Sequence, residues 1–437
     1  MDENFTIMIH KLLYTLGSSI RNPSLRKHLA FLEKTHYWSK KELEDYQFFK
    51  LKELLNYSYD NSIFYRKHFT SNNFNPNDLK KLSDIKKIPM LQKSDLLKNN
   101  STIHTNWLGK KFKAITSGSS GNSLSFQRDE SADSFNRAVT QYGYSWYNVH
   151  PWHRNGYFWG FNYTFEKKIR TNFLDFLQNR FRVFSYQKSE LKFFIKKLSK
   201  AVYIHGYSSM IYQVAKLINQ GDLTKPKGII FIKGTSEKIY KNYHKEVIKA
   251  FGSKIRSEYG ATESGIIAFE CPAGNMHINM EGVIVEEVNN EIIVTNLQMK
   301  SFPIIRYRLG DYIKLASNSI KCNCGRNHSI LEEVTGRIGQ LVYGKNEIYP
   351  SLIFYYIFKN LDLHHSISLN YQIIQKEKGK LFIRIEQQLK QIELKKIDSE
   401  FVKYFGQDIQ YDIQEKCILH SEKEKLKSFI SHLHYEF

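Results

Sequence analysis

The sequence contains few cysteines and no long apolar segment. Its four cysteines in 437 residues are too few for a disulfide scaffold in a chain of this size. No window reaches the ~18 uninterrupted apolar residues that a membrane span requires. The apolar run at 5–16 contains His10 and Lys11 and is not followed by a small-residue cleavage site, so we predict no signal peptide. Together these absences favour a globular protein of the cytoplasm.

Acidic residues are also scarce relative to basic ones. The chain has 43 Asp and Glu against 64 Lys and Arg, a formal net charge of +21. Such an excess suits nucleic acid, an anionic lipid surface or an anionic substrate. Because the lysines are scattered and no helix-turn-helix or RNA-binding signature accompanies them, we expect no nucleic-acid partner. The Lys-rich stretch at 188–200 leaves peripheral association with the inner membrane face open.

The residue pattern predicts an α/β protein with more than one domain, as the length also suggests. Residues 1–110 are expected to be helical, with a capping box at Ser39-Lys40-Lys41-Glu42. Beyond them, short β-branched or aromatic runs such as 201–204 and 228–232 alternate with amphipathic stretches, which favours a largely parallel sheet. The segment 282–297 alternates like antiparallel strands, and the last hundred residues or so predict a small α+β unit.

The segment Thr116-Ser117-Gly118-Ser119-Ser120-Gly121-Asn122 is rich in glycine and hydroxyl side chains. Its glycines permit unusual backbone conformations, and its hydroxyl and N–H groups can surround a phosphate. It is not a Walker A loop, because no Gly-Lys-Ser/Thr follows and the next residues alternate like a strand. Taken alone, the segment also suits an ordinary hairpin loop.

Three further motifs follow this loop. They are Ser257-Glu258-Tyr259-Gly260-Ala261-Thr262-Glu263, Tyr307-Arg308-Leu309-Gly310-Asp311 and Gly336-Arg337. In this order, the loop and the three motifs resemble the adenylate-forming superfamily of acyl-CoA synthetases and related ligases, from about residue 45 to the C-terminus. The branch most similar to the chain contains phenylacetate–CoA ligases and proteins of capsular polysaccharide biosynthesis.

The resemblance implies a fold and a reaction. Residues 1–110 would be the helical N-terminal part of a large multi-layer α/β domain, 111–337 its adenylation core, and 338–437 a small mobile C-terminal domain. The enzyme would be an AMP-forming carboxylate ligase that uses ATP and Mg²⁺. It would convert a small carboxylic acid to an acyl-adenylate and pass the acyl group to an acceptor.

The resemblance also assigns roles to individual residues. The loop residues Thr116, Ser117, Gly118, Ser119, Ser120 and Gly121 would hold the β- and γ-phosphates. Tyr259 would stack on adenine beside Gly260, with Glu258 in the same binding motif. Thr262 would contact the α-phosphate, Glu263 would bind Mg²⁺, Asp311 would take the ribose hydroxyls, and Arg337 would reach ribose or phosphate. Singly, Glu258 and Glu263 also suit surface carboxylates, and Asp311 suits a turn.

A lysine near the chain end is implied as the catalytic group of adenylation. Aligning the apolar tail makes Lys425 the match, with Glu424 in place of the usual glycine, and Lys423 and Lys427 are the alternatives. Relatives often carry an acidic pair after Gly-Arg at the hinge. This chain has 338–340 as Ile-Gly-Gln instead.

Cys271, His277, Cys322 and Cys324 form a candidate zinc site. Three sulfurs and one imidazole are a tetrahedral donor set of structural Zn²⁺. Their spacings differ from the usual two-residue knuckles, so two reduced turn cysteines and an unrelated histidine remain the alternative.

The acceptor of the acyl group is open between two chemistries. CoA is the first choice, and an amine on a surface sugar is the alternative. A third interpretation is an inactive scaffold. Aromatic residues at 142–146, with Trp159 and 206–208, are candidates for the acyl pocket, and His205 is either beside the carboxylate or structural.

Overall fold

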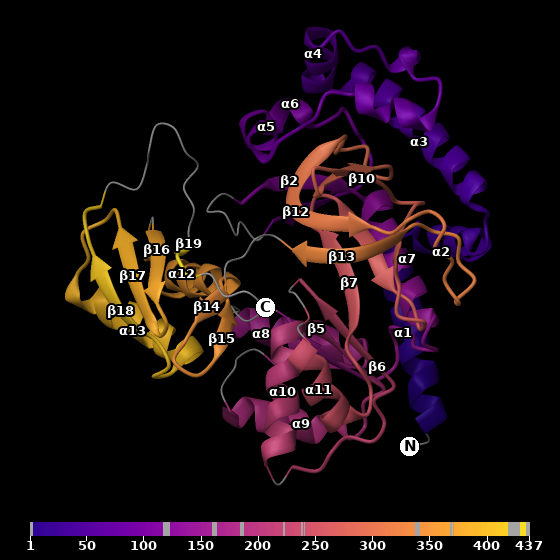
Figure 1. Ribbon diagram of the computed structural model, residues 1–437. Coiled ribbons are helices and arrows are strands. Elements are labelled where there is room, and N and C mark those ends of the chain that lie inside the picture. The colour runs from indigo at the N-terminus through magenta and orange to yellow at the C-terminus, as the bar shows by residue number, and fades with distance from the viewer. Residues whose placement is uncertain are drawn as a thin grey trace.

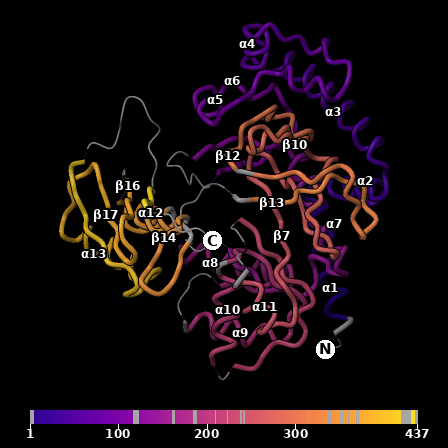
Figure 2. The backbone as a smooth tube through the Cα atoms, viewed as in Figure 1, coloured from indigo at the N-terminus to yellow at the C-terminus, as the bar shows by residue number. Residues whose placement is uncertain are grey.

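The structure of the protein is a computed structural model. It describes residues 3–437 except 117–122, 160–163, 184–187, 222, 237–238, 240, 337–340, 368, 370, 418–428 and 434–437 (Figure 2). No helix in these described parts is long and apolar enough to cross a membrane.

The first hundred residues are helical, as predicted. They form α1 (Glu3–Arg21), α2 (Leu25–Thr35), α3 (Lys40–Asn61), α4 (Ile63–Ser71), α5 (Lys93–Lys98) and α6 (Asn100–Ile103), with 3-10 turns η1 (Pro76–Asp78) and η2 (Leu82–Lys87). The capping box before α3 is confirmed: the Ser39 hydroxyl accepts from the Glu42 N–H, and the Glu42 carboxylate accepts from the Ser39 N–H at 2.7 Å. These paired groups fix where α3 begins.

An eleven-stranded mixed sheet is the centre of the large domain, in the order β10-β11-β12-β13-β9-β8-β7-β6-β5-β3-β4 (Figure 1). One half is parallel, as the alternating pattern predicted, and runs β4-β3-β5-β6-β7. Its strands are β3 (Asn155–Phe158), β4 (Arg180–Val183), β5 (Tyr203–Tyr207), β6 (Phe231–Thr235) and β7 (Arg256–Ala261).

The other half of the same sheet is antiparallel. Its strands are β8 (Gly265–Glu270), β9 (Met276–Ile278), β10 (Val283–Val288), β11 (Glu291–Asn296), β12 (Tyr307–Leu315) and β13 (Ile330–Gly336). The strands predicted at 282–297 are confirmed as the β10–β11 hairpin. Asn289 and Asn290 make its turn with φ of 53° and 63°, values that asparagine tolerates better than most residues.

Helices cover both faces of the parallel half. Bounds in this region are β1 (Lys111–Ile115), β2 (Ser125–Asp129), α7 (Glu130–Ser145), α8 (Phe165–Leu177), α9 (Lys188–Leu198), α10 (Ser208–Gln220) and α11 (Lys241–Phe251). Successive side chains of a strand point to opposite faces. On β5, Ile204 joins the core under α9, α10 and α11, whereas Tyr203 packs with Tyr144 of α7. The α/β fold class is therefore confirmed, with the parallel and antiparallel strands joined in one sheet.

The C-terminal part is a small α+β unit with its own core. Its elements are β14 (Leu341–Tyr343), β15 (Ile348–Pro350), α12 (Leu352–His365), β16 (Tyr371–Glu377), β17 (Lys380–Ile385), α13 (Gln391–Phe405), β18 (Gln410–Gln414) and β19 (Phe429–Ser431). It lies beside α10 of the large domain (Figure 1). There Lys216 Nζ is 2.6 Å from the Glu347 carboxylate, and the Tyr207 and Tyr356 rings are 5.7 Å apart. The predicted boundary at 337/338 falls outside the described residues and stays a prediction.

Candidate functional site

The motif at 257–263 forms the end of β7 and the turn that follows. β7 is the strand at which the sheet changes from parallel to antiparallel. A Cβ on Gly260 would lie 2.5 Å from the Gly265 carbonyl oxygen, and the β7–β8 register shifts between Tyr259 and Gly260. Glycine is required here because the neighbouring backbone leaves no space for a side chain.

Tyr259 and Asp311, both predicted to hold the nucleoside, are in contact. The Tyr259 hydroxyl donates to Asp311 Oδ2 at 2.6 Å. Asp311 is buried on β12 and follows Gly310, whose φ is +85°. Two motifs about fifty residues apart in sequence are therefore adjacent in space, and a ring lies beside a carboxylate that can accept two hydroxyl donors.

Glu263 and Thr262 follow β7 in the turn. The Glu263 side chain is 2% exposed, and the Tyr307 hydroxyl donates to it at 3.4 Å. Thr262 is held through its carbonyl oxygen, which accepts from the Arg128 guanidinium. Arg128 lies on β2 and also contacts Asp133 at 3.4 Å. Arg128 was not among the predicted site residues, because nothing local in the sequence distinguishes it from other basic strand residues.

Thr116 begins the Ser/Gly-rich loop and is hydrogen-bonded to Leu124, which follows the loop. Its N–H donates to the Leu124 carbonyl at 2.9 Å, and its hydroxyl accepts from the Leu124 N–H at 2.8 Å. The β1–β2 pairing continues from this point. Thr116 therefore fixes the two ends of the segment 117–122 relative to each other.

Several predicted site residues lie outside the described residues. These are Ser117, Gly118, Ser119, Ser120 and Gly121 of the loop, Arg337 at the hinge, and Lys425 with its alternatives Lys423 and Lys427. Their roles stay predictions.

Glu258 is buried in an ion pair that sequence reasoning did not find. Lys233 of β6 lies 2.7 Å from one Glu258 oxygen, and both side chains are 6% exposed. The other oxygen, Oε2, is buried with no hydrogen-bond partner among the described residues. Residues 235 and 258 pair across β6 and β7, so this ion pair ties the strand of the second motif to its parallel neighbour.

Removing one partner of this pair should destabilise the protein strongly. We expect Lys233→Ala to lower the free energy of unfolding by about 3–5 kcal/mol, because it leaves the Glu258 charge buried and uncompensated. Lys314→Ala is the control: its ion pair with Glu332 is 61% and 49% exposed and should contribute less than about 1 kcal/mol. Denaturant unfolding of both variants measures the difference, and equal losses would contradict the assignment.

His205 is a core residue with both ring nitrogens in contact with neighbours. Nδ1 lies 3.1 Å from the Tyr144 hydroxyl and Nε2 lies 3.1 Å from Asn155 Oδ1. Burial, reinforced by Arg180 and Lys233, lowers the pKa of His205 well below its usual value. The structural interpretation of His205 therefore suits the geometry. Of the candidate acyl-pocket aromatics, Trp159 stacks on Tyr207 at 4.6 Å.

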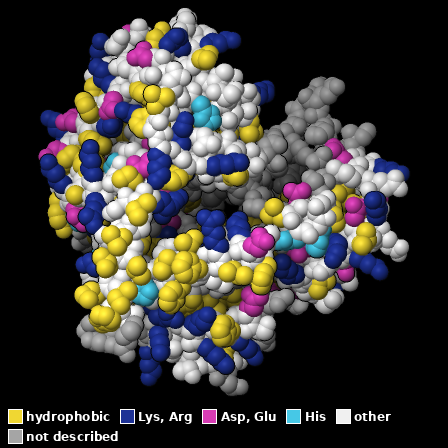
Figure 3. All heavy atoms as spheres, turned by 180° about the vertical axis from the view of Figure 1, so that it is seen from behind, with side chains coloured by type: hydrophobic (Ala, Val, Ile, Leu, Met, Phe, Trp, Pro, Cys, Tyr) yellow, Lys and Arg dark blue, Asp and Glu magenta, His cyan; other side chains and the backbone are white. Residues whose placement is uncertain are grey.

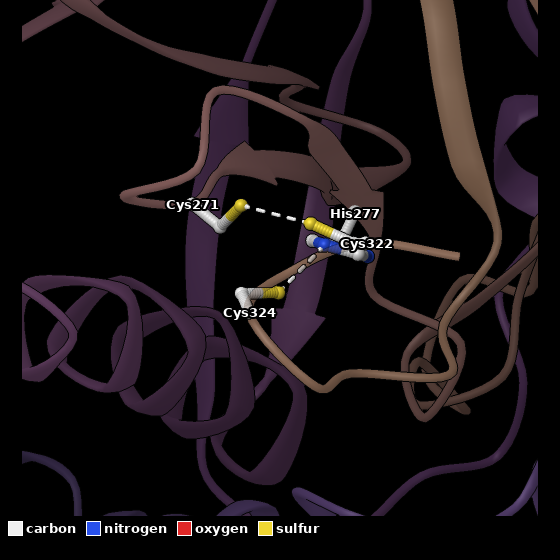
Figure 4. Close-up of side chains that lie close together, drawn as sticks. All are labelled: Cys271, His277, Cys322 and Cys324. Atoms are coloured by element: carbon white, nitrogen blue, oxygen red, sulfur yellow. Dashed lines mark hydrogen bonds between the residues drawn. The ribbon is translucent and has the colours of Figure 1, made fainter. Parts of the chain in front are cut away.

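The four predicted zinc ligands lie together (Figure 4). Their ligand atoms all lie within 4.8 Å of one another. Cys271 Sγ is 3.6 Å from Cys322 Sγ, and Cys324 Sγ is 3.2 Å from His277 Nε2. His277 Nδ1 lies 3.2 Å from the His328 carbonyl oxygen, so it donates there and leaves Nε2 directed at the sulfurs.

The topology explains the unusual ligand spacing. Cys271 directly follows β8, His277 lies on β9, and Cys322 and Cys324 lie in the connection before β13. β9 pairs with both β8 and β13, so strand pairing brings the two halves together. Burial lowers the pKa of His277 to about 4, which leaves a neutral imidazole, the form that binds metals.

An open groove of about 560 Å³ lies beside these cysteines. Tyr142 and Trp146 from the candidate acyl-pocket segment line this groove together with Cys324 and Arg326. The Arg326 guanidinium packs 3.8 Å from the Trp146 ring centroid. The aromatic residues at 142–146 are thus divided between this groove and the core, where Tyr144 is buried.

The fold of this chain is that of adenylate-forming ligases. 2-Hydroxyisobutyryl-CoA ligase, in complex with its acyl-AMP and CoA in the thioesterification state, is similar at a TM-score of 0.62 and 15% identity over 92% of each chain. The open conformation of that ligase is similar at 0.58 and 14% identity, over 91% of this chain and 93% of the other. These likenesses show the fold.

A sequence relative adds to this structural likeness. Protein CapK of Staphylococcus aureus is 25% identical over 307 residues, which are 68% of this chain and 67% of CapK. No family model matches the chain. The predicted fold of the adenylate-forming superfamily is confirmed, and CapK is a sequence relative of this chain.

Proposed function

We propose that this chain activates a carboxylic acid with ATP and transfers the acyl group to CoA. The observation that carries the proposal is the contact between Tyr259 and Asp311 on an adenylate-forming fold. That contact joins two motifs whose nucleoside roles were predicted separately. The structurally similar 2-hydroxyisobutyryl-CoA ligase binds an acyl-AMP together with CoA, which favours CoA over an amine as acceptor.

In the proposed first step, a carboxylate oxygen attacks the α-phosphorus of ATP and pyrophosphate leaves. The chain must orient the nucleotide, balance the charge developing on the phosphates and exclude water. Asp311 would accept both ribose hydroxyls, while the Tyr259 ring orients the base. Arg128, which binds the Thr262 carbonyl, would position the turn that faces the phosphates. In the second step the CoA sulfur attacks the acyl carbon and AMP leaves.

Glu263 suits the magnesium ion that the reaction requires. It is a carboxylate almost fully removed from solvent, and its hydrogen bond from Tyr307 is long. A buried anion that is weakly hydrogen-bonded needs a further positive partner. A bound Mg²⁺ would neutralise phosphate charge. The remaining residues of the site would hold the substrates in line.

An acid panel and two acceptors test the proposed activity. We expect carboxylate-dependent exchange of labelled pyrophosphate into ATP with at least one acid of an aryl, fatty and amino-acid panel. With that acid, CoA should release AMP and an amino sugar should not. AMP release with the amino sugar alone would replace CoA by an amine, and no exchange with any acid would favour the scaffold interpretation.

We also propose that the four clustered ligands bind one structural Zn²⁺. Three sulfurs and one nitrogen complete a tetrahedral shell with no open position for substrate. The second contact of His277, to the His328 carbonyl, fixes the ring in the orientation a ligand needs. Such an ion would tie the β8–β9 turn to the connection between β12 and β13. Of these two strands, β12 carries Asp311.

A further inference from the structure

Helix α1 directs its apolar side chains toward solvent. Phe5, Met8, Leu12, Leu16 and Ile20 recur at helical spacing and are between 48% and 78% exposed. The polar and aromatic side faces the protein instead: His10 Nδ1 lies 3.1 Å from the Leu177 carbonyl, and the Tyr14 ring is 5.9 Å from Trp152. This orientation is the reverse of a surface helix of a globular protein, whose apolar stripe faces the core.

Helix α8 has the same reversed orientation. Phe165, Ile169, Phe173 and Phe176 are between 56% and 78% exposed. Its charged residue Asp175 is buried instead, where it accepts from Arg182 Nε at 2.6 Å. An ion pair therefore anchors the inner side of α8, and the outer side carries three aromatic rings.

Helices α1 and α8 are neighbours. The His10 ring of α1 meets the Phe176 ring of α8 at a centroid distance of 6.2 Å, so exposed apolar side chains of both helices lie on the same side of the protein. We call these exposed side chains the apolar face; seen from behind, hydrophobic groups gather over this side of the molecule (Figure 3). Its members are Phe5, Met8, Leu12, Leu16, Ile20, Phe165, Ile169, Phe173 and Phe176. Contiguous exposed apolar patches mark interaction sites.

The charges around the apolar face are mostly positive. The described side chains of α1 and α8 include Lys11, Arg21, Lys167, Lys168 and Arg170, against Glu166 and the buried Asp175. The whole chain carries +21. An apolar stripe bordered by cations suits a helix that lies in the interface of an anionic lipid bilayer.

We propose that the apolar face of α1 and α8 attaches this protein to the surface of a membrane containing anionic lipid. The aromatic and aliphatic side chains enter the boundary between headgroups and acyl chains, while the bordering lysines and arginines contact lipid phosphates. A second copy of the chain is a poorer occupant, because a two-fold contact through this face would bring the same cations of both copies together. The attachment is independent of the proposed ligase activity.

Vesicle sedimentation of the full-length protein tests the attachment. Vesicles of phosphatidylcholine alone are compared with vesicles of equal parts phosphatidylcholine and phosphatidylglycerol. We expect binding to the anionic vesicles that weakens as salt is raised. Phe173→Ser/Phe176→Ser should reduce the partition coefficient by about a hundredfold, because each of the two buried aromatic rings contributes about tenfold. Lys167→Glu/Arg170→Glu should remove the preference for anionic lipid.

Matched controls distinguish vesicle binding through the apolar face from nonspecific binding through other exposed apolar side chains. Phe49 and Ile63 are 67% and 74% exposed on α3 and α4, and Phe49→Ser/Ile63→Ser should bind vesicles as the wild type does. Pyrophosphate exchange in vesicle-free solution should be unchanged in Phe173→Ser/Phe176→Ser, so this test is distinguishable from that of the ligase. The proposal would be overturned if the wild-type protein bound neither kind of vesicle. It would also be overturned if Phe49→Ser/Ile63→Ser lost as much vesicle binding as Phe173→Ser/Phe176→Ser. A dimer in light scattering that Phe173→Ser/Phe176→Ser dissociates would assign the face to a second copy.

Discussion

Replacing Glu263 with glutamine should reduce carboxylate-dependent ATP–pyrophosphate exchange by about a hundredfold or more. Glutamine keeps the shape of a side chain that is 2% exposed and removes only its negative charge. The magnesium ion would lose its protein ligand, and the charge developing on the phosphates would be less well balanced. Initial exchange rates at saturating acid and ATP measure the effect.

Two further variants make this result specific. Glu332→Gln removes a carboxylate that is 49% exposed, and it should leave exchange unchanged. Lys425→Ala should match Glu263→Gln, whereas Lys423→Ala and Lys427→Ala should exchange normally. All variants must unfold at the wild-type temperature. Exchange by Glu263→Gln within about twofold of wild type would remove this carboxylate from the reaction.

Protein purified without chelator should contain close to one equivalent of zinc, and Cys322→Ser should contain little. Metal that binds only the folded state stabilises it by about 4 kcal/mol when free zinc is 1,000 times its dissociation constant. We therefore expect Cys322→Ser, or wild type treated with chelator, to lose several kcal/mol of unfolding free energy. Elemental analysis and denaturant unfolding measure the two quantities.

Cys417 provides a matched control for the metal site. It is buried in the C-terminal unit, and its thiol donates to the Gln414 carbonyl at 3.4 Å. Cys417→Ser should keep the full zinc content, and chelator should destabilise it as much as wild type. Zinc below about half an equivalent in wild-type protein would contradict the proposal, as would equal zinc losses in the two cysteine variants.

Local pattern predicted much of the fold. The capping box at Ser39 and the alternation at 282–297 depend on neighbours within a few residues, and both were confirmed. The alternating strands and helices beyond residue 112 correctly indicated a parallel sheet. Strand β7 pairs with a parallel strand on one side and an antiparallel strand on the other. This pairing depends on contacts between residues far apart in sequence, which local periodicity does not encode.

The candidate site was predictable only where motifs carried it. The family resemblance named Tyr259 and Asp311, and the donor chemistry of three thiols and one imidazole named the four candidate zinc ligands; their roles stay predictions. Lys233 and Arg128 were missed, because each acts through a partner more than twenty residues away. The reversed orientation of α1 was missed for a related reason: the spacing of Leu12 and Leu16 predicts a helix with one apolar side, but only the packed structure shows which side faces the protein.

The contact between Lys216 and Glu347 has a consequence for the proposed two-step reaction. These side chains are 19% and 43% exposed, and an ion pair at such a surface is worth at most about 1 kcal/mol. By itself, this ion pair therefore biases the C-terminal unit toward this arrangement by a factor of only about five. Suppose that one arrangement of the C-terminal unit serves adenylation and another serves thioester formation. With so weak an ion pair, the bound substrate or intermediate would then determine which arrangement is populated.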